Sequence, residues 1–217
     1  TYFGWPATEW VNLDHVWTYN ISDGTWAVEP PMLEPGKAYP GIATMNEELW
    51  IIGGLFRAER GTKATATVEI YDPRTRRYRF GPKYPAARGQ IVALTVGGRL
   101  YAVGGENLPV SGASAEMFSI GPGETEWRPA PPAPGPLMQA AGCVVNGKMY
   151  ISSGPVSECP GFFVYDPAER KWSSVSHPAE PAPRASLVAA MGDEIWVMGG
   201  RGKTAGVKAT YAYSTTT

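Results

Sequence analysis

The sequence has few of the residues that mark disulfide-stabilised or metal-binding proteins. It contains only two cysteines, Cys143 and Cys159, among 217 residues. Two cysteines are too few for a disulfide framework or for a cysteine-ligated metal site. The only histidines are His15 and His177, and their separation does not suit a pair of metal ligands. We therefore expect no metal site and no bound cofactor.

Long apolar runs and an excess of one charge are also missing. No run of residues approaches the roughly 18 apolar positions that a membrane-spanning helix requires. The formal net charge is −1 and only 18% of the residues are charged. Neither nucleic acid nor a membrane is therefore expected as a partner attracted by bulk electrostatics. No helical periodicity appears along the chain, which predicts an all-β protein.

A short apolar strand that runs into glycine recurs along the chain. Full copies cover residues 48–54, 99–105, 148–154 and 194–200, and residues 2–4 resemble the end of a fifth. The first-glycine positions 4, 53, 104, 153 and 199 are separated by 49, 51, 49 and 46 residues. A period near fifty that recurs this often indicates a repeat architecture.

Pairs of large apolar residues, mostly aromatic and seven positions apart, form a second landmark of each unit. These pairs are Tyr19/Trp26, Tyr71/Tyr78, Tyr165/Trp172 and the degenerate pair Ile120/Trp127. From the second member of a pair to the next glycine position the distance is always 26 or 27 residues. From each glycine position to the first residue of the following pair, the distance varies from 12 to 18 residues. One half of the unit is thus constant, and the other half contains a loop of variable length.

The pattern predicts four antiparallel strands in each unit. In the second unit the strands are expected near residues 38–45, 49–52, 65–71 and 78–80, with a polar loop over residues 55–64. A four-stranded sheet with two apolar faces must cover both, and a ring of such sheets does so with only short edges. We therefore predict a β-propeller. Small residues on the first strands suit the crowded axis, and the aromatic residues of the fourth strands are expected to wedge between neighbouring sheets.

These units resemble kelch repeats. The resemblance depends on the glycine pair after the second strand, on the aromatic residue followed by an Asp-Pro turn in Tyr71–Pro73 and Tyr165–Pro167, and on the aromatic seven residues later. It covers essentially the whole chain. Three positions depart from the pattern: Trp5 and Ser153 replace glycines, and Ile120–Pro122 replaces the aromatic turn of the third unit.

We expect residues 1–217 to form a single kelch-type β-propeller domain of about five units. The first unit lacks its inner strand and the last lacks its outer strand, and the remaining strands do not combine into one tidy sheet. We therefore interpret the chain as a fragment of a larger propeller. A ring of five sheets, two of them imperfect, is the alternative.

Loops that vary in length on a constant scaffold are typical of a recognition surface. The variable loops all join the second strand to the third, so they share one face with the residues that precede the inner strands. The resemblance to kelch repeats singles out Arg88, and Arg184 with an offset of one residue, as the arginine often found before the inner strand. The candidate ligand-binding residues on this face are Arg57, Arg60, Arg88, Glu106, Asn107, Gln139, Arg184 and Arg201.

Two interpretations of these residues remain open. Clustered around the axis, the arginines would provide donors for a carboxylate or an acidic peptide. Alternatively, they pair with loop carboxylates or carbonyls and hold adjacent sheets together. The sequence does not distinguish between them.

The resemblance implies a binding scaffold that recognises a protein or peptide. The alternative is a carbohydrate-active propeller, either a sialic-acid mutarotase-like enzyme or a lectin, in which Arg88, Arg184 and Glu106 would grip a sugar acid. The sequence contains no nucleophile elbow, phosphate-binding glycine loop or zinc helix. We accordingly assign no catalytic residue and expect a binding protein rather than an enzyme.

Overall fold

Every regular element that the structure describes is a β-strand. The computed structural model describes residues 14–34, 36–59, 61–108, 112–154, 159–176, 185–201 and 206–216. Within these ranges it contains strands β1 to β19. In the same ranges no helix is long and apolar enough to cross a membrane. The all-β prediction is confirmed.

Three complete four-stranded antiparallel sheets form the middle of the molecule. The first contains β3 (Gly41–Met45), β4 (Glu48–Ile52), β7 (Val68–Asp72) and β8 (Arg77–Phe80). The second contains β9 (Val92–Val96), β10 (Arg99–Val103), β11 (Met117–Ile120) and β12 (Arg128–Ala130). The third contains β13 (Ala141–Val145), β14 (Lys148–Ser153), β15 (Gly161–Asp166) and β16 (Lys171–Val175).

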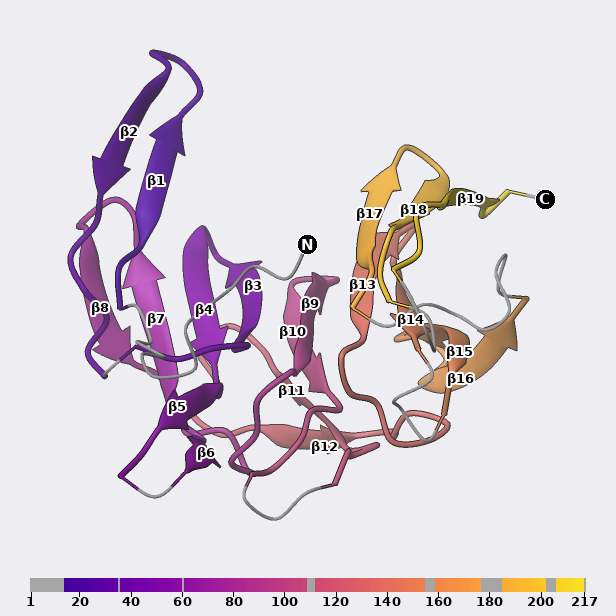
Figure 1. Ribbon diagram of the computed structural model, residues 1–217, viewed down its shortest axis with the longest axis horizontal. Helices are drawn as coiled ribbons and strands as arrows, with labels where there is room; N and C mark the ends of the chain where they lie inside the picture. The colour runs from indigo at the N-terminus through magenta and orange to yellow at the C-terminus, as the bar shows by residue number, and fades with distance from the viewer. Residues whose placement is uncertain are drawn as a thin grey trace.

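A smaller sheet lies at each end. The N-terminal one is the hairpin of β1 (Trp17–Asn20) and β2 (Thr25–Val28). The C-terminal one contains β17 (Leu187–Met191), β18 (Glu194–Met198) and β19 (Thr210–Ser214). The sheets stand side by side in an open arc whose inner side is formed by β3, β9, β13 and β17 (Figure 1). This arrangement confirms a propeller of four-stranded sheets with incomplete first and last members.

Buried apolar clusters fill the spaces between neighbouring sheets. One joins the sheets of β4 and β10 and includes Trp50, Ile70 and Trp127. The next two lie between the following pairs of sheets. The sheets that contain β10 and β14 therefore bury both faces against their neighbours, as a repeat architecture requires.

The glycine pairs allow the next sheet to approach closely. A Cβ atom on Gly53 would collide with the carbonyl oxygen of Arg88, and one on Gly104 would lie 2.7 Å from that of Leu137. Both glycines have a positive φ, 61° and 74°, which glycine adopts at no steric cost. The amide of Gly54 donates to the Arg88 oxygen at 2.8 Å. The links that lead into β9 and β13 are thus each hydrogen-bonded to the preceding sheet.

The paired aromatic residues lie opposite each other across the third and fourth strands. Ring centroids are 5.0 Å apart for Tyr19 and Trp26, 4.8 Å for Tyr71 and Tyr78, and 5.1 Å for Tyr165 and Trp172. Such cross-strand pairs stabilise a sheet and specify its register.

The tryptophans of the fourth-strand region also bind the preceding link, as the wedging prediction requires. Trp127 Nε1 donates to the carbonyl oxygen of Pro82 and Trp172 Nε1 to that of Pro131, both at 2.9 Å. For Trp26 the prediction of burial is wrong, because this side chain is 66% exposed. It belongs to the end sheet, and no described strand lies beyond that sheet.

Residues 55–64, expected as an irregular polar loop, contain a hairpin. Strand β5 (Leu55–Arg57) pairs with β6 (Thr62–Ala64). The hairpin is anchored at its base because Leu55 and Ala38 exchange two backbone hydrogen bonds of 2.7 Å. Its other strand is anchored by the Ala64 amide, which donates to the carbonyl oxygen of Leu108 at 3.1 Å.

Candidate functional site at the axial mouth

One position in each of four consecutive sheets forms the opening at the axis. Tyr39, Gln90, Gln139 and Ala185 each lie shortly before an inner strand and have φ values of 54°, 59°, 50° and 51°. Non-glycine residues rarely adopt this conformation and keep it only where their surroundings impose it. The surroundings here include the neighbouring sheets, since the backbone N–H of Gln90 donates to the backbone oxygen of Tyr39 at 2.8 Å. The backbone N–H of Ala185 likewise donates to the backbone oxygen of Gln139 at 2.9 Å.

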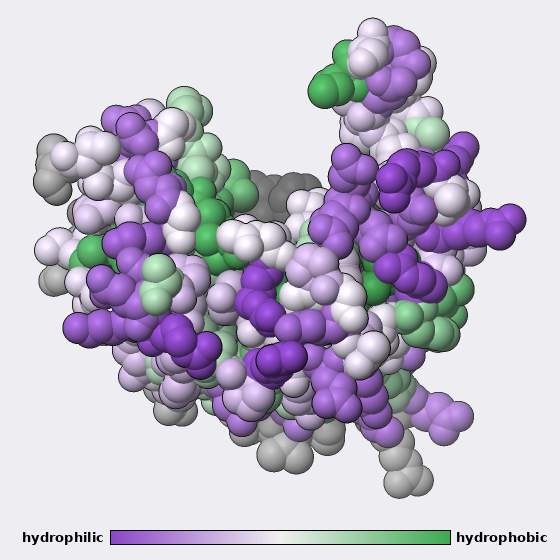
Figure 2. Space-filling view, turned by 180° about the vertical axis from the view of Figure 1, so that it is seen from behind, coloured by the Kyte–Doolittle hydropathy of each residue, from purple (hydrophilic) through white to green (hydrophobic). Residues whose placement is uncertain are grey.

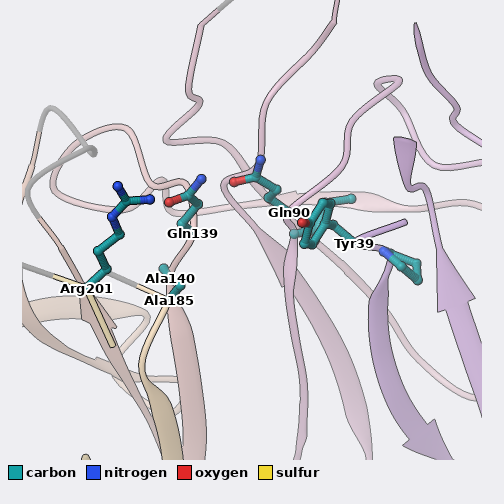
Figure 3. A pocket seen from close by; sticks show the side chains of 8 residues that line it. Tyr39, Gln90, Gln139, Ala140, Ala185 and Arg201 are labelled. Carbon is teal, nitrogen blue, oxygen red and sulfur yellow. The ribbon is translucent and has the colours of Figure 1, made fainter. Parts of the chain in front are cut away.

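These residues surround a hollow of about 460 Å³ that we call the axial mouth. It is lined by Tyr39, Pro40, Gln90, Ile91, Gln139, Ala140, Ala185 and Arg201. The side chains of Gln90, Gln139 and Arg201 lie in a row and turn their polar ends to the same side (Figure 3). The volume falls within the range of small-ligand sites. Side chains from three neighbouring sheets therefore line one hollow.

Arg88 does not line the axial mouth. It lies two residues before Gln90, and its guanidinium forms an ion pair with the carboxylate of Glu116. Lys37 has the corresponding position two residues before Tyr39, and its buried Nζ lies 2.8 Å from Oε1 of the buried Glu69. Both cations thus pair with a carboxylate at or beside the third strand of their own sheet. This geometry favours the structural interpretation of Arg88 over the ligand-binding one.

Glu106 orients one of the polar groups in the mouth. Its carboxylate accepts a hydrogen bond from Nε2 of Gln90. Its backbone also exchanges two hydrogen bonds of 2.9 Å with Gly89. Burial raises the pKa of the Glu106 carboxyl, because the charged form loses hydration. Glu106 therefore acts on the mouth by fixing the Gln90 side chain.

The remaining predicted residues are divided between the mouth and its margin. Gln139 and Arg201 line the mouth. Arg57 is exposed on β5 and lines a neighbouring hollow, and the exposed Asn107 follows Glu106 in the loop after β10. Arg60 and Arg184 lie outside the described residues.

Sequence reasoning missed Tyr39 and Gln90. A signal for both exists in the sequence. Tyr39 and Gln90 are 51 residues apart, and Gln90 and Gln139 are 49 residues apart, which is close to the repeat period. Sequence reasoning instead singled out Arg88, two residues before Gln90. The repeat spacing alone does not show that Gln90 rather than Arg88 reaches the mouth, whereas the backbone conformation does.

The described residues contain no group of three or more His, Cys, Asp or Glu side chains that could hold a metal ion. His15 is exposed and lies beside Asp14, with Nδ1 2.8 Å from Oδ1. His177 lies outside the described residues.

Comparisons with known proteins agree with this architecture. The Kelch motif matches residues 36–83, which span the sheet of β3, β4, β7 and β8. The chain is 25% identical over 213 residues to Kelch-like protein terF of Aspergillus terreus, covering 91% of the chain and 46% of that protein. It is 28% identical over 130 residues to Kelch-like protein 33 of Homo sapiens, covering 59% of the chain and 24% of that protein. The chain spans less than half the length of both relatives.

The fold is also similar to that of a solved structure described as the structure of YjhT. The TM-score is 0.76 at 17% identity, and the match covers 88% of this chain and 67% of that one. At this level of identity the similarity concerns the fold alone.

Proposed function

Because this chain belongs to the kelch-repeat β-propellers, we propose that it is a binding module that recognises a protein or peptide segment at its axial mouth. The observation that supports this most directly is the row formed by Gln90, Gln139 and Arg201. Arg201 is exposed and forms no ion pair with any described residue. Its donors are therefore available to a partner.

The charge around the mouth favours an anionic partner. Arg57 and Lys63 on the β5–β6 hairpin are exposed and, like Arg201, have no ion-pair partner among the described residues. The carboxylates of Glu106 and Glu116 are occupied by Gln90 and Arg88. Unpaired guanidinium groups bind carboxylates through charge-assisted, often bidentate hydrogen bonds. We therefore propose a segment that contains Asp or Glu side chains.

Selection from a displayed library of random dodecapeptides against the immobilised chain tests this function. We expect enriched peptides to contain acidic residues, and we expect Arg201→Ala to raise their Kd about tenfold, as for a moderate interface hot spot. Arg77→Ala is the matched control, because Arg77 is an exposed arginine on β8. Equal effects of the two substitutions, or failure to enrich any sequence, would contradict the proposal.

A small carbohydrate acid is the second candidate, favoured by the volume of the mouth. Its support is weaker, because Arg88 and Glu106 are both engaged within the protein. Isothermal titration with N-acetylneuraminate and with glucuronate provides the discriminating measurement. Saturable binding that is lost in Arg201→Ala, together with failure of the peptide selection, would favour the carbohydrate function.

A further inference from the structure

A second hollow lies beside the axial mouth. It has a volume of about 250 Å³ and is lined by the β5–β6 hairpin and by Leu108 of the loop after β10. Its apolar lining includes Leu55, Phe56 and Leu108, while the exposed Arg57 and Thr62 also contribute. We call it the anchor hollow.

Tyr39 lines both hollows. Its backbone is held in place, because its carbonyl oxygen accepts the Gln90 amide at 2.8 Å. The residue is nevertheless 60% exposed, so its ring is a surface that a bound chain can cross. The anchor hollow and the axial mouth are thus adjacent sections of one surface.

The anchor hollow is held in shape by backbone hydrogen bonds. Leu55 is fixed to Ala38 on one side, and Ala64 donates to Leu108 on the other. Thr65 donates to the carbonyl oxygen of Gly54 at 3.0 Å. A site that is ordered before binding loses less conformational entropy when a ligand arrives.

We infer that the anchor hollow receives one large apolar side chain of an extended acidic peptide, while a carboxylate further along the same peptide reaches Arg201 in the axial mouth. This inference rests on the proposed function and specifies the partner. The hollow is smaller than the 300–1,000 Å³ typical of a site for a whole ligand, so its volume suits a single side chain. Its lining by Leu55, Phe56 and Leu108 favours an apolar group.

Charge complementarity predicts which residues of the peptide flank the apolar anchor. Arg57 lines the anchor hollow and Arg201 lines the axial mouth, so cations lie on both sides of Tyr39. A peptide that crosses Tyr39 is therefore best matched by acidic residues on both sides of its apolar anchor. Burial of that anchor in a preformed hollow is expected to strengthen binding about 10- to 100-fold.

A double-mutant cycle with the selected peptides tests the inference. The peptide anchor is replaced by Ala, and the hollow is changed by Leu108→Glu or by the milder Phe56→Ala. In the unchanged protein we expect loss of the anchor to raise Kd about 10- to 100-fold, whereas in Leu108→Glu it should change Kd less than about threefold. Phe80→Ala on β8 is the control, because Phe80 is exposed on the outer strand of the sheet of β3, β4 and β7 and does not line the anchor hollow.

Three results would overturn the inference. Enriched peptides without an apolar residue would do so, as would an anchor whose loss costs the same in the unchanged protein and in both hollow variants. In either case, continued dependence on Arg201 leaves the proposed function intact. Failure to enrich any peptide would remove both proposals together. Thermal unfolding of each variant separates loss of binding from loss of folding, and Phe56→Ala replaces Leu108→Glu if the latter does not fold.

Discussion

Gly53 lies where the link into β9 passes closest to the end of β4. Its φ of 61° and the approach of the Arg88 carbonyl oxygen impose two separate requirements on this position. Gly97, in the turn between β9 and β10, has a similar φ of 58°, but a Cβ atom there would meet no atom within 4 Å. Comparing the two glycines therefore separates the cost of a positive φ from the cost of a close contact with the next sheet.

We predict that Gly97→Ala lowers the free energy of unfolding by about 1–2 kcal/mol, the cost of a left-handed conformation in a residue with a side chain. Gly53→Ala should cost about 1–3 kcal/mol more, because its Cβ atom also overpacks the contact between two sheets. Urea unfolding of both variants measures the difference. Equal losses would show that the close approach to Arg88 has no energetic importance.

A carboxylate in the turn after β11 carries a pH-dependent contribution to stability. Hydrogen bonds from Arg99 and from the Gly121 amide, at 2.6 and 2.8 Å, lower the pKa of Glu124 to about 2. The ionised form is therefore favoured in the folded state. Its contribution is complete above the pKa of about 4.3 expected in the unfolded chain and is lost as the pH falls toward 2.

We predict that Glu124→Gln flattens the acid side of the stability profile. Between pH values of about 4.5 and 2, the urea midpoint of the unchanged protein should fall more steeply than that of the variant. The two profiles should run parallel near pH 7. Parallel profiles in the acid range as well would mean that the interaction with Arg99 contributes nothing.

At the scale of the element, the fourth-strand tryptophan acts as a wedge only when another sheet precedes its own. Trp127 is 8% exposed, contacts Tyr84 edge-to-face with centroids 5.2 Å apart, and donates to Pro82. Trp26 has the equivalent place in the first unit but is 66% exposed. The same residue type at the same repeat position thus has two different environments.

We predict that Trp127→Ala lowers the free energy of unfolding by about 3–5 kcal/mol, as expected for a large buried side chain. Trp26→Ala should cost less than about 1 kcal/mol, because it removes an exposed side chain. Chemical denaturation provides both values. Similar costs for the two substitutions would contradict the assignment of the wedge.

The β1–β2 hairpin is attached to the next sheet mainly through one carboxylate. Glu29 accepts hydrogen bonds from Thr18 at 2.6 Å, from Arg76 at 2.8 Å and from the hydroxyl of Tyr71. Led by the Thr18 bond, these interactions lower the pKa of Glu29, while burial raises that of Tyr71 to about 12. These polar contacts thus connect the end sheet, whose apolar side chains are largely exposed, to the next sheet.

At the scale of the whole molecule, the two ends of the arc present apolar surface. Trp17 and Trp26 are exposed on the first sheet, and Leu187 and Met191 on the last. The hairpin projects from the rest of the surface (Figure 2). Each interior sheet buries its two faces against neighbours, so we propose that further kelch units cover these end faces.

This proposal makes Trp26 a reporter of the larger ring. In a longer chain with a further kelch unit before the first sheet, Trp26→Ala should become costly, approaching the about 3–5 kcal/mol expected for Trp127→Ala. Comparison of urea unfolding in the two lengths of chain measures the change. An unchanged cost would show that no further unit covers the first sheet.

Much of the fold follows from local sequence patterns. The glycine pair and the seven-residue aromatic spacing identify the units because each pattern serves a contact that recurs in every sheet, as with Tyr71 and Tyr78. The β5–β6 hairpin could not be predicted in this way. It depends on pairing with Ala38 and Leu108, and both partners lie outside the segment itself.

The sequence by itself determined the repeat, the all-β class and the face on which variable loops gather, because short-range spacing encodes strand, turn and wedge. Only the tertiary structure decided which polar groups reach the axis. Arg88 and Gln90 are two residues apart, yet one pairs with Glu116 and the other lines the axial mouth. The physical reason is the left-handed backbone conformation before each inner strand. Contacts between neighbouring sheets impose that conformation, and no local pattern specifies it.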